Sequence, residues 1–255
     1  MFGRHYLQRF RDHRIVAAIK RRLRRHKPLM ESAAPKPWDE VAAAARKNGL
    51  TYIRDVGDGV TLARYEKDGH LDYDTYRAVQ EAGNKAKLDW VFATEATIAL
   101  IAEDARRRSE TVEHILCHGT RNGAEQRWFR QHFPDADILG TEISETATQF
   151  EMTIRWDFHD IKDGWSDHWD LIYSNSWDHT YDPHKMFSAW ARCLRPGKLL
   201  YLEHTKYHEL VNHLDLFGAT PLALRKMVES CGLRYFGSLG SPERSVLMFS
   251  KDQSG

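Results

Sequence analysis

From about residue 112 onward, short apolar runs alternate with segments in which apolar residues recur at helical spacing. Apolar runs of this length, closed by glycine, proline or polar residues, predict buried strands. The predicted strands are His114–Cys117, Ile138–Glu142, Thr153–Trp156, Asp170–Ser174 and Leu199–Glu203. Helices are predicted over residues 123–132, 183–194 and 221–230. Such alternation indicates a mostly parallel sheet with helices on both faces.

The chain ends on two further strand-like runs, Leu233–Gly237 and Ser245–Phe249, with a turn at Gly240–Glu243 between them. A connection this short joins antiparallel strands, because a parallel pair needs a long crossover. We therefore predict the α/β class, with a Rossmann-like sheet of seven strands that is mostly parallel and has an antiparallel C-terminal strand.

The first 110 residues follow a less regular pattern. Residues 1–27 are predicted to form a basic helix, and three prolines make residues 28–37 a linker. The further predicted elements are a helix at Trp38–Lys47, strands at Thr51–Arg54 and Val60–Tyr65, and helices at Tyr73–Glu81 and 84–108. We divide the chain into a basic helix and linker (1–37), a helical and small β extension that forms part of an acceptor site or a lid (38–110), and the sheet domain (111–255).

The composition bounds the class of protein. With 255 residues, 42% of them hydrophobic, the chain has room for one α/β domain and a modest appendage. No apolar run approaches the roughly 18–20 residues of a membrane-spanning helix. The N-terminus lacks the apolar stretch of a secretion signal. Three widely spaced cysteines, Cys117, Cys193 and Cys231, fit reduced thiols, so we expect a cytoplasmic protein.

The net charge of +1 hides a basic N-terminal segment. Residues 1–27 hold ten Lys or Arg against one acid, Asp12, which leaves the rest of the chain mildly acidic. An acidic body predicts no nucleic-acid partner. Basic residues interleaved with aromatic ones suit contact with an anionic membrane surface, so we expect peripheral contact through residues 1–27. A solvated helix or an oligomer contact is the alternative, and the oligomeric state stays open.

Candidate binding residues stand where the first three strands end. In an open α/β sheet, ligands bind beyond the carboxyl ends of the strands, near the reversal of strand order. The first strand runs into His118–Gly123, whose glycines permit close approach of a ligand to the backbone. Glu142 ends the second strand about 20 residues later, where such folds bind ribose hydroxyls. Asp157 and Phe158 follow the third strand and suit an adenine amino group and the face of the base.

The fourth strand begins the segment Asp170–Ser176 and runs into polar and aromatic residues, which include Asn175, Asp178 and His179. Together with His114–Glu125, Gly140–Ser144, Trp156–His159 and Leu194–Gly197, this segment resembles class I S-adenosylmethionine-dependent methyltransferases. The resemblance covers about residues 110–250 and is nearest to methyltransferase-domain proteins found beside glycan and natural-product genes. The antiparallel ending and the missing G-x-G-x-x-G argue against a nucleotide-dependent oxidoreductase.

The resemblance implies S-adenosylmethionine as the cofactor of residues 111–255. It implies cofactor-binding roles for His118, Gly119, Thr120, Arg121, Gly123, Glu142, Ile143, Asp157, Phe158 and Asn175. Gly119 and its neighbours would line the methionine part, and Asn175 would face the sulfonium and the acceptor. The usual acid and second glycine of the first motif are replaced here. We therefore expect His118 or Arg121 to contact the amino-acid carboxylate.

The implied reaction is O-methylation of a small molecule or a sugar or glycan hydroxyl, which requires removal of a proton. His179 with Asp178 is the first candidate base, and His204 after the fifth strand is the second. A divalent metal could instead bind Asp178, His179, Asp182, His184 and Glu203, but their spacing matches no standard pattern, so we predict no metal. The alternative function is a non-catalytic scaffold or binding protein, which the altered glycine motif suggests.

Overall fold

The computed structural model of the protein describes residues 52–108 and 111–252. The predicted basic helix, the linker, the helix at Trp38–Lys47 and the membrane contact of residues 1–27 lie outside the described residues. No helix in the described ranges is long and apolar enough to cross a membrane.

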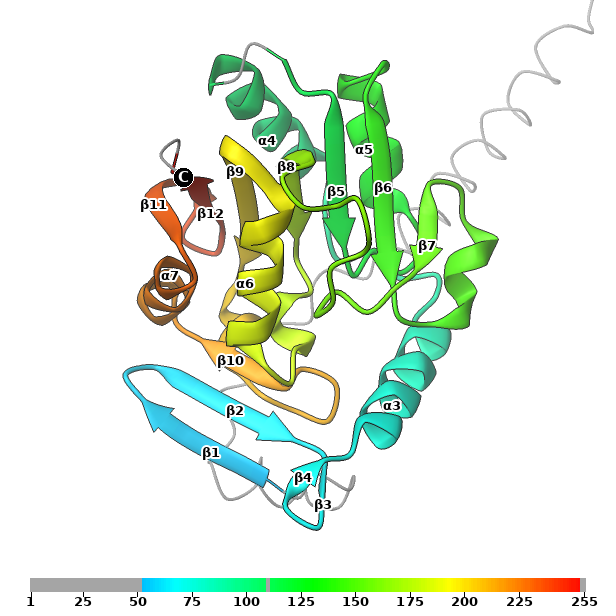
Figure 1. Cartoon of the computed structure of the whole chain (residues 1–255), viewed down its shortest axis with the longest axis vertical. Coiled ribbons are helices and arrows are strands. Elements are labelled where there is room, and N and C mark those ends of the chain that lie inside the picture. Colours follow the sequence, from blue (N-terminus) through cyan, green and yellow to red (C-terminus); the bar gives the residue numbers. More distant parts are fainter. Residues whose placement is uncertain (1–51, 109–110, 253–255) are drawn as a thin grey trace, which may run out of the picture. The chain divides into compact units, whose positions relative to one another are not determined.

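Twelve strands and five α-helices make up this part of the chain, with three short 3₁₀ helices between them (Figure 1). The strands are β1 (Tyr52–Gly57), β2 (Val60–Arg64), β3 (Glu66–Lys67), β4 (His70–Leu71), β5 (His114–His118), β6 (Asp137–Glu142), β7 (Thr153–Arg155), β8 (Trp169–Ser174), β9 (Leu194–His204), β10 (Phe217–Ala219), β11 (Leu233–Ser241) and β12 (Arg244–Lys251). The α-helices are α3 (Tyr73–Ala86), α4 (Glu95–Arg108), α5 (Ala124–His132), α6 (Pro183–Cys193) and α7 (Pro221–Ser230). The 3₁₀ helices are η1 (Glu145–Gln149), η2 (Trp177–His179) and η3 (Lys206–Glu209).

The central sheet has seven strands in the order β11-β12-β9-β8-β5-β6-β7. Strands β5 to β9 pair in parallel, and β12 alone runs antiparallel to both of its neighbours, β9 and β11. The chain builds outward from β5 to β7, then returns to β8 on the other side of β5. The predicted seven-stranded, mostly parallel sheet with an antiparallel C-terminal strand is confirmed.

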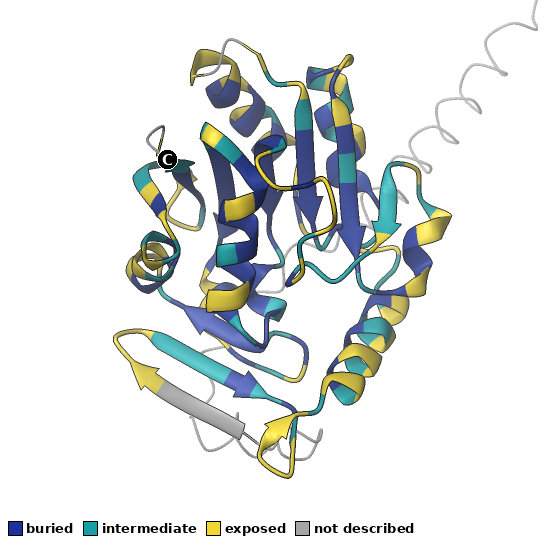
Figure 2. Ribbon diagram, in the orientation of Figure 1, coloured by how far each residue is buried: buried dark blue, intermediate teal, exposed yellow. Residues whose placement is uncertain are grey.

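Two apolar cores cover the two faces of this sheet (Figure 2). Successive residues of β8 point to opposite faces, so Ile172 joins the core under α6 and α7, while Leu171 and Tyr173 join the core under α4 and α5. Strands buried on both faces read as continuous apolar runs, which explains why β5, β8 and β9 were recognisable in the sequence.

A second sheet, of order β1-β2-β10, joins the N-terminal extension to a late part of the chain. Strand β10 pairs antiparallel with β2, so that Phe217 lies opposite Leu62. The sequence analysis identified β1 and β2 but missed the three-residue strand β10, because a run this short carries no periodicity of its own.

The single helix predicted over residues 84–108 is wrong. Helix α3 ends at Ala86 and α4 begins at Glu95, with a non-helical connection between them. The carbonyl oxygen of Leu88 accepts from Asn122, and that of Trp90 from Arg121, instead of from helical amides. The hydroxyl of Thr94 caps α4 by accepting from Thr97 N at 3.1 Å.

Helix α3 also runs further than the predicted Tyr73–Glu81, because it passes through Gly83. A Cβ on Gly83 would lie 2.5 Å from Leu214 Cδ2, so the glycine lets the loop around Leu214 approach the helix. The helix lies beyond the carboxyl ends of β6 and β7, with one exposed face and one buried face (Figures 1 and 2). Its buried residues, Tyr76, Gln80 and Asn84, recur at the four-residue spacing of a single helix face.

Candidate cofactor and acceptor site

A pocket lies at the carboxyl ends of β5, β6 and β8, where the order of strands in the sheet reverses. Helix α3 and the loop around Leu214 complete its wall. The predicted site residues that line it are Gly119, Arg121, Glu142, Ile143, Asp157, Phe158 and His179. The others are Tyr76, Gln80, Gly83, Asn84, Lys87, Ser176 and Leu214. This is the position at which open α/β sheets bind ligands.

The turn after β5 contains two glycines, and at Gly119 the main chain itself lines the pocket. Gly119 has φ +71°, and a Cβ there would lie 2.6 Å from Ser176 Cβ, so the end of β5 meets the segment after β8 only because the side chain is absent. Gly123 also has a positive φ and precedes α5, but it packs beside Thr153 and Arg127 and does not line the pocket. The two predicted glycines therefore do different things: one shapes the pocket and the other starts a helix.

Glu142 is held at the end of β6 by backbone amides. Its Oε1 accepts from Ser144 N at 3.0 Å and its Oε2 from Arg121 N at 3.2 Å. Burial raises the pKa of Glu142, and the amide of Ser144 opposes that rise. Each carboxylate oxygen keeps a further lone pair, so the group can accept hydrogen bonds from a vicinal diol. Ile143 lines the pocket beside it.

Asp157 lines the pocket, but both of its oxygens already have partners. Oδ1 accepts from the amide and from Nδ1 of His159, at 3.0 and 2.7 Å, and Oδ2 accepts from the Tyr73 hydroxyl at 2.8 Å. Burial alone would raise the pKa of Asp157, but the bonds from His159 hold it below its usual value. Phe158 lines the pocket beside it. The amino group of an adenine base would therefore either share Asp157 with the Tyr73 hydroxyl or displace that hydroxyl.

Helix α3 adds polar groups that the sequence analysis did not identify. Asn84 accepts through Oδ1 from the Thr146 hydroxyl at 2.7 Å, which orients its amide. Its Nδ2 is buried and makes no hydrogen bond of good geometry, but it lies close enough to Glu142 to oppose the rise that burial causes in the pKa of that carboxyl. Lys87 and Arg121 are the two cations of the pocket wall. The spacing of Gln80, Asn84 and Lys87 would have placed them on one helix face, had the predicted helix not been ended at Glu81.

The roles predicted for His118 and Thr120 need correction. His118 is 2% exposed, stacks on Trp190 at 4.5 Å and bonds through Nδ1 to the Thr141 hydroxyl. Burial lowers the pKa of His118 to about 3, so the ring is neutral and offers no charge to a carboxylate. Thr120 is buried and accepts from Gln126 Nε2 at 2.9 Å. Of the two predicted carboxylate partners, only Arg121 lines the pocket.

Two residues from later strands also lie away from the pocket wall. Asn175 is buried and accepts from the hydroxyl of Ser176, and Ser176 lines the pocket in its place. His204 is 3% exposed, and its Nε2 contacts the carbonyl oxygen of Ala219 at 2.9 Å. Strand β9 runs one residue past the predicted Glu203, so His204 belongs to the strand and its side chain is buried inside the fold. The prediction of His204 as a base is therefore corrected.

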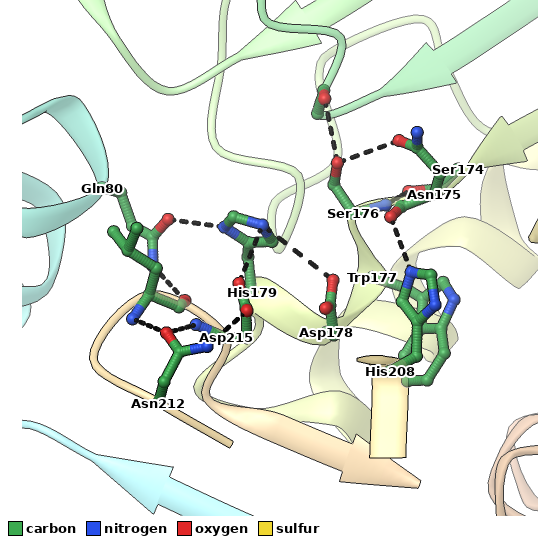
Figure 3. Close-up of polar contacts among 12 residues, drawn as sticks. Gln80, Ser174, Asn175, Ser176, Trp177, Asp178, His179, His208, Asn212 and Asp215 are labelled. Carbon is green, nitrogen blue, oxygen red and sulfur yellow. Dashed lines mark hydrogen bonds and ion pairs between the residues drawn. The ribbon is translucent and has the colours of Figure 1, made fainter. Parts of the chain in front are cut away.

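His179 also lines the pocket, and its ring is held by Gln80 of α3 (Figure 3). Gln80 Nε2 donates to Leu214 O at 2.7 Å, so Gln80 Oε1 is the atom that accepts from His179 Nδ1, also at 2.7 Å. A proton on Nδ1 leaves Nε2 of the neutral ring as an acceptor. That nitrogen lies 3.3 Å from Asp215 Oδ1 and 4.0 Å from Asp178 Oδ1.

Asp178 is the most buried member of this cluster. It is 6% exposed, and among the described residues its Oδ1 has no hydrogen-bond partner. Burial, and next the neighbouring Asp215, raise the pKa of Asp178 to about 7. Asp215 is partly exposed and accepts through Oδ2 from Asn212 Nδ2. Asp215 carried no signal in the sequence, because it lies in a loop far along the chain from its partners.

The larger metal set considered from the sequence does not assemble. Asp182 caps α6 by accepting from Lys185 N, and His184 is exposed. Glu203 is fully buried, where it accepts from the Tyr173 hydroxyl and pairs with Arg244. Only Asp178 and His179 come together, and Asp215 joins them: one ligand atom from each lies within 4.8 Å of the others.

Comparison with known proteins bears on the fold. No protein-family model and no curated protein matches the sequence. The structure of the 1,6-didemethyltoxoflavin N1-methyltransferase of Burkholderia thailandensis, with bound 1,6-didemethyltoxoflavin and S-adenosylhomocysteine, is similar to this chain with a TM-score of 0.58. The alignment covers 78% of this chain and 99% of that one, at 11% identity. The fold is that of a class I methyltransferase.

Weaker similarities accompany this one. A sugar N-methyltransferase from Streptoalloteichus has a TM-score of 0.48 at 15% identity, over 78% of this chain and 99% of that one. The cyclase SpnF has a TM-score of 0.45 at 12% identity, over 60% of this chain and 80% of that one. At such identities the methyltransferase resemblance expected from the sequence is confirmed as a fold, and the chemistry has to be argued from the site.

Proposed function

We propose that this protein is an S-adenosylmethionine-dependent methyltransferase that acts on a hydroxyl of a small molecule or a glycan. The observation that carries the proposal is Glu142: a carboxylate at the end of β6, held by two backbone amides, beside the glycine turn at the strand-order reversal. In a class I methyltransferase fold this is where the ribose of the cofactor is bound.

The residues of the pocket fit this cofactor in two further respects. Gly119 forms a cradle that a Cβ would fill, which suits close approach of the methionine part to the backbone. The buried amide of Asn84 lies beside Glu142 and opposes the rise that burial causes in the pKa of that carboxyl, which favours the charged form that accepts hydrogen bonds from a ribose. We assign the amino-acid carboxylate to Arg121 and Lys87, the two cations of the pocket wall. The Burkholderia enzyme of similar fold has S-adenosylhomocysteine bound, which supports S-adenosylmethionine as the cofactor here by analogy.

The cofactor supplies a methyl group on a positively charged sulfur. Transfer breaks the methyl–sulfur bond, whose electron pair stays on sulfur, and forms a bond from methyl carbon to the acceptor oxygen, which loses its proton. The residues of the chain then have to align the acceptor and receive that proton. We assign the acceptor to the part of the pocket lined by His179 and Gln80, with Asp178 buried beside it, since Glu142 and Asp157 are taken by the nucleoside.

Calorimetric titration with S-adenosylmethionine and S-adenosylhomocysteine tests the proposal. We expect micromolar binding that Glu142→Ala weakens at least tenfold. Glu151→Ala, an exposed acid outside the pocket wall, serves as the matched control and should bind like the wild type. If wild-type protein with an intact circular dichroism spectrum bound neither compound, the methyltransferase proposal would be rejected. The alternative function, a non-catalytic scaffold or binding protein, would then be favoured.

We also propose, from the sequence alone, that the enzyme is cytoplasmic and contacts anionic membranes through residues 1–27. Co-sedimentation of the full chain with phosphatidylserine vesicles should fall sharply when the basic residues of this segment are replaced by glutamine. Equal sedimentation of the two proteins would argue against the contact.

A further inference from the structure

We infer that Asp178, His179 and Asp215 form a binding site for a divalent cation at the acceptor end of the pocket. The site itself stands on the geometry of these side chains, and its role in catalysis rests on the proposed methyl transfer. No metal was predicted from the sequence, because the spacing of the candidate ligands matched no standard pattern, and Asp215 was not among those candidates.

The orientation of the imidazole is the first argument. The carbonyl of Leu214 orients the Gln80 amide, and Gln80 Oε1 in turn holds the proton of His179 on Nδ1. Nε2 is therefore turned towards two carboxylate oxygens (Figure 3). Metal-binding histidines are commonly oriented in this way, with the remote ring nitrogen donating to an oxygen and the near one free for the metal.

The unpartnered oxygen of Asp178 is the second argument. A buried carboxylate oxygen without a hydrogen bond is costly, and such groups in native structures are usually paired with a donor or an ion. Asp178 Oδ1 is buried, lacks a hydrogen-bond partner among the described residues and points to the same space as Asp215 Oδ1 and His179 Nε2. A cation at that point would supply the missing partner.

The balance of charge is the third argument. Two carboxylates face one imidazole, and within residues 52–108 and 111–252 no Lys or Arg forms an ion pair with either carboxylate. Lys87 lines the same pocket and attracts both carboxylates across a distance, without forming an ion pair with either. A doubly charged ion would neutralise Asp178 and Asp215 together.

The spacing of the ligand atoms suits a cation after a small contraction. Nε2 lies 3.3 Å from Asp215 Oδ1 and 4.0 Å from Asp178 Oδ1. Ligands that bind one ion at about 2.1–2.4 Å lie roughly 3–4 Å from each other. One imidazole and two carboxylates suit Mn²⁺, Mg²⁺, Fe²⁺ or Zn²⁺.

Three protein ligands leave coordination positions free, and His179 is the ligand that lines the pocket. In the proposed function an oxygen of the acceptor would take one of them. The cation would then orient the hydroxyl and promote loss of its proton. This role replaces the one first predicted for His179, in which a free imidazole accepts the proton directly.

Titration of the metal-free full chain with Mn²⁺, followed by the electron paramagnetic resonance signal of the free ion, tests the site. We expect one Mn²⁺ per chain, bound at micromolar concentration. Asp215→Asn should weaken binding at least tenfold, since it removes a ligand that is partly exposed and therefore safe for the fold. Asp163→Asn, an exposed acid outside the cluster, is the matched control and should bind normally.

Binding of S-adenosylhomocysteine, measured on the same proteins, separates this inference from the proposed function. Loss of Mn²⁺ binding in Asp215→Asn with cofactor binding retained would support the site. Wild-type protein that binds the cofactor but no Mn²⁺ below 1 mM (roughly −4 kcal/mol) would overturn it. So would Mn²⁺ binding that Asp215→Asn leaves unchanged. Mn²⁺ binding without cofactor binding would support the cation site but would reject the proposed methyltransferase function.

Discussion

The two ends of the pocket are built in different ways. The end that we assign to the cofactor consists of residues at the ends of β5, β6 and β7, where Gly119, Glu142 and Asp157 are placed by the strands themselves. The end that we assign to the acceptor has His179 at the pocket wall, and Gln80 from α3 and Asp215 from a distant loop contact its ring. Strand ends meet because the sheet aligns them, whereas the acceptor end exists only when separate segments pack together. Variants that act on one end and spare the other therefore test this division.

The largest effect should follow from Gly119→Ala at the cofactor end. The new Cβ would meet Ser176 Cβ at 2.6 Å on a backbone with φ +71°. We expect a loss of roughly 2–4 kcal/mol in the free energy of unfolding and no measurable binding of S-adenosylhomocysteine. Urea denaturation and calorimetry measure the two effects.

Gly164→Ala provides the control for backbone strain alone. Gly164 has φ +83° with nothing within 4 Å of the added Cβ, and it lies outside the pocket wall. Its cost should stay near about 1 kcal/mol, with cofactor binding unchanged. If the two variants behaved alike, close approach at Gly119 would not be the reason for the glycine.

The next effect concerns how the free energy of unfolding depends on pH, through the buried ring of His118 at the end of β5. The pKa of His118 is about 3 in the folded protein, below the unfolded value of 6.5. Its contribution to stability is therefore complete above pH 6.5 and is lost as the pH falls from 6.5 toward 3, by about 1.4 kcal/mol per pH unit. The free energy of unfolding should fall between pH 7 and pH 5, and His118→Phe should reduce that fall. An unchanged slope in His118→Phe would contradict the buried neutral ring.

A smaller effect is expected from Gln80→Leu at the acceptor end. The variant removes the oxygen that holds the proton on His179 Nδ1. We expect Mn²⁺ affinity to fall about 3- to 10-fold, as for other residues that orient a metal ligand. Gln80→Glu, which keeps an acceptor oxygen, should restore most of the affinity. Equal loss in both variants would mean that Gln80 only fills space.

The smallest effect should come from Tyr73→Phe, which frees one oxygen of Asp157. The Tyr73 hydroxyl lies 2.8 Å from Asp157 Oδ2, on a tyrosine that is 36% exposed. Its loss should cost less than about 1 kcal/mol of stability and should tighten binding of S-adenosylhomocysteine two- to fivefold, since the base no longer competes with the hydroxyl. Weaker binding would indicate that Tyr73 itself contacts the cofactor.

Much of the sheet and of the cofactor end could be predicted from the sequence. Strands such as β5 and β8 are short, mostly apolar runs, and Thr220 and Pro221 begin α7 as their local preferences indicate. Glu142 was found because a strand end and a distance along the chain are local properties. These features depend on few residues that are close in sequence.

Other features depend on contacts between distant residues, and only the tertiary structure decided them. The break between α3 and α4 follows from bonds donated by Arg121 and Asn122. The burial of His118 and His204 follows from the faces to which their strands turn them. Asp215 joins Asp178 and His179 through the fold of a loop that has no periodicity of its own. Local preference determined the elements, and long-range packing determined which of their side chains meet at the acceptor end.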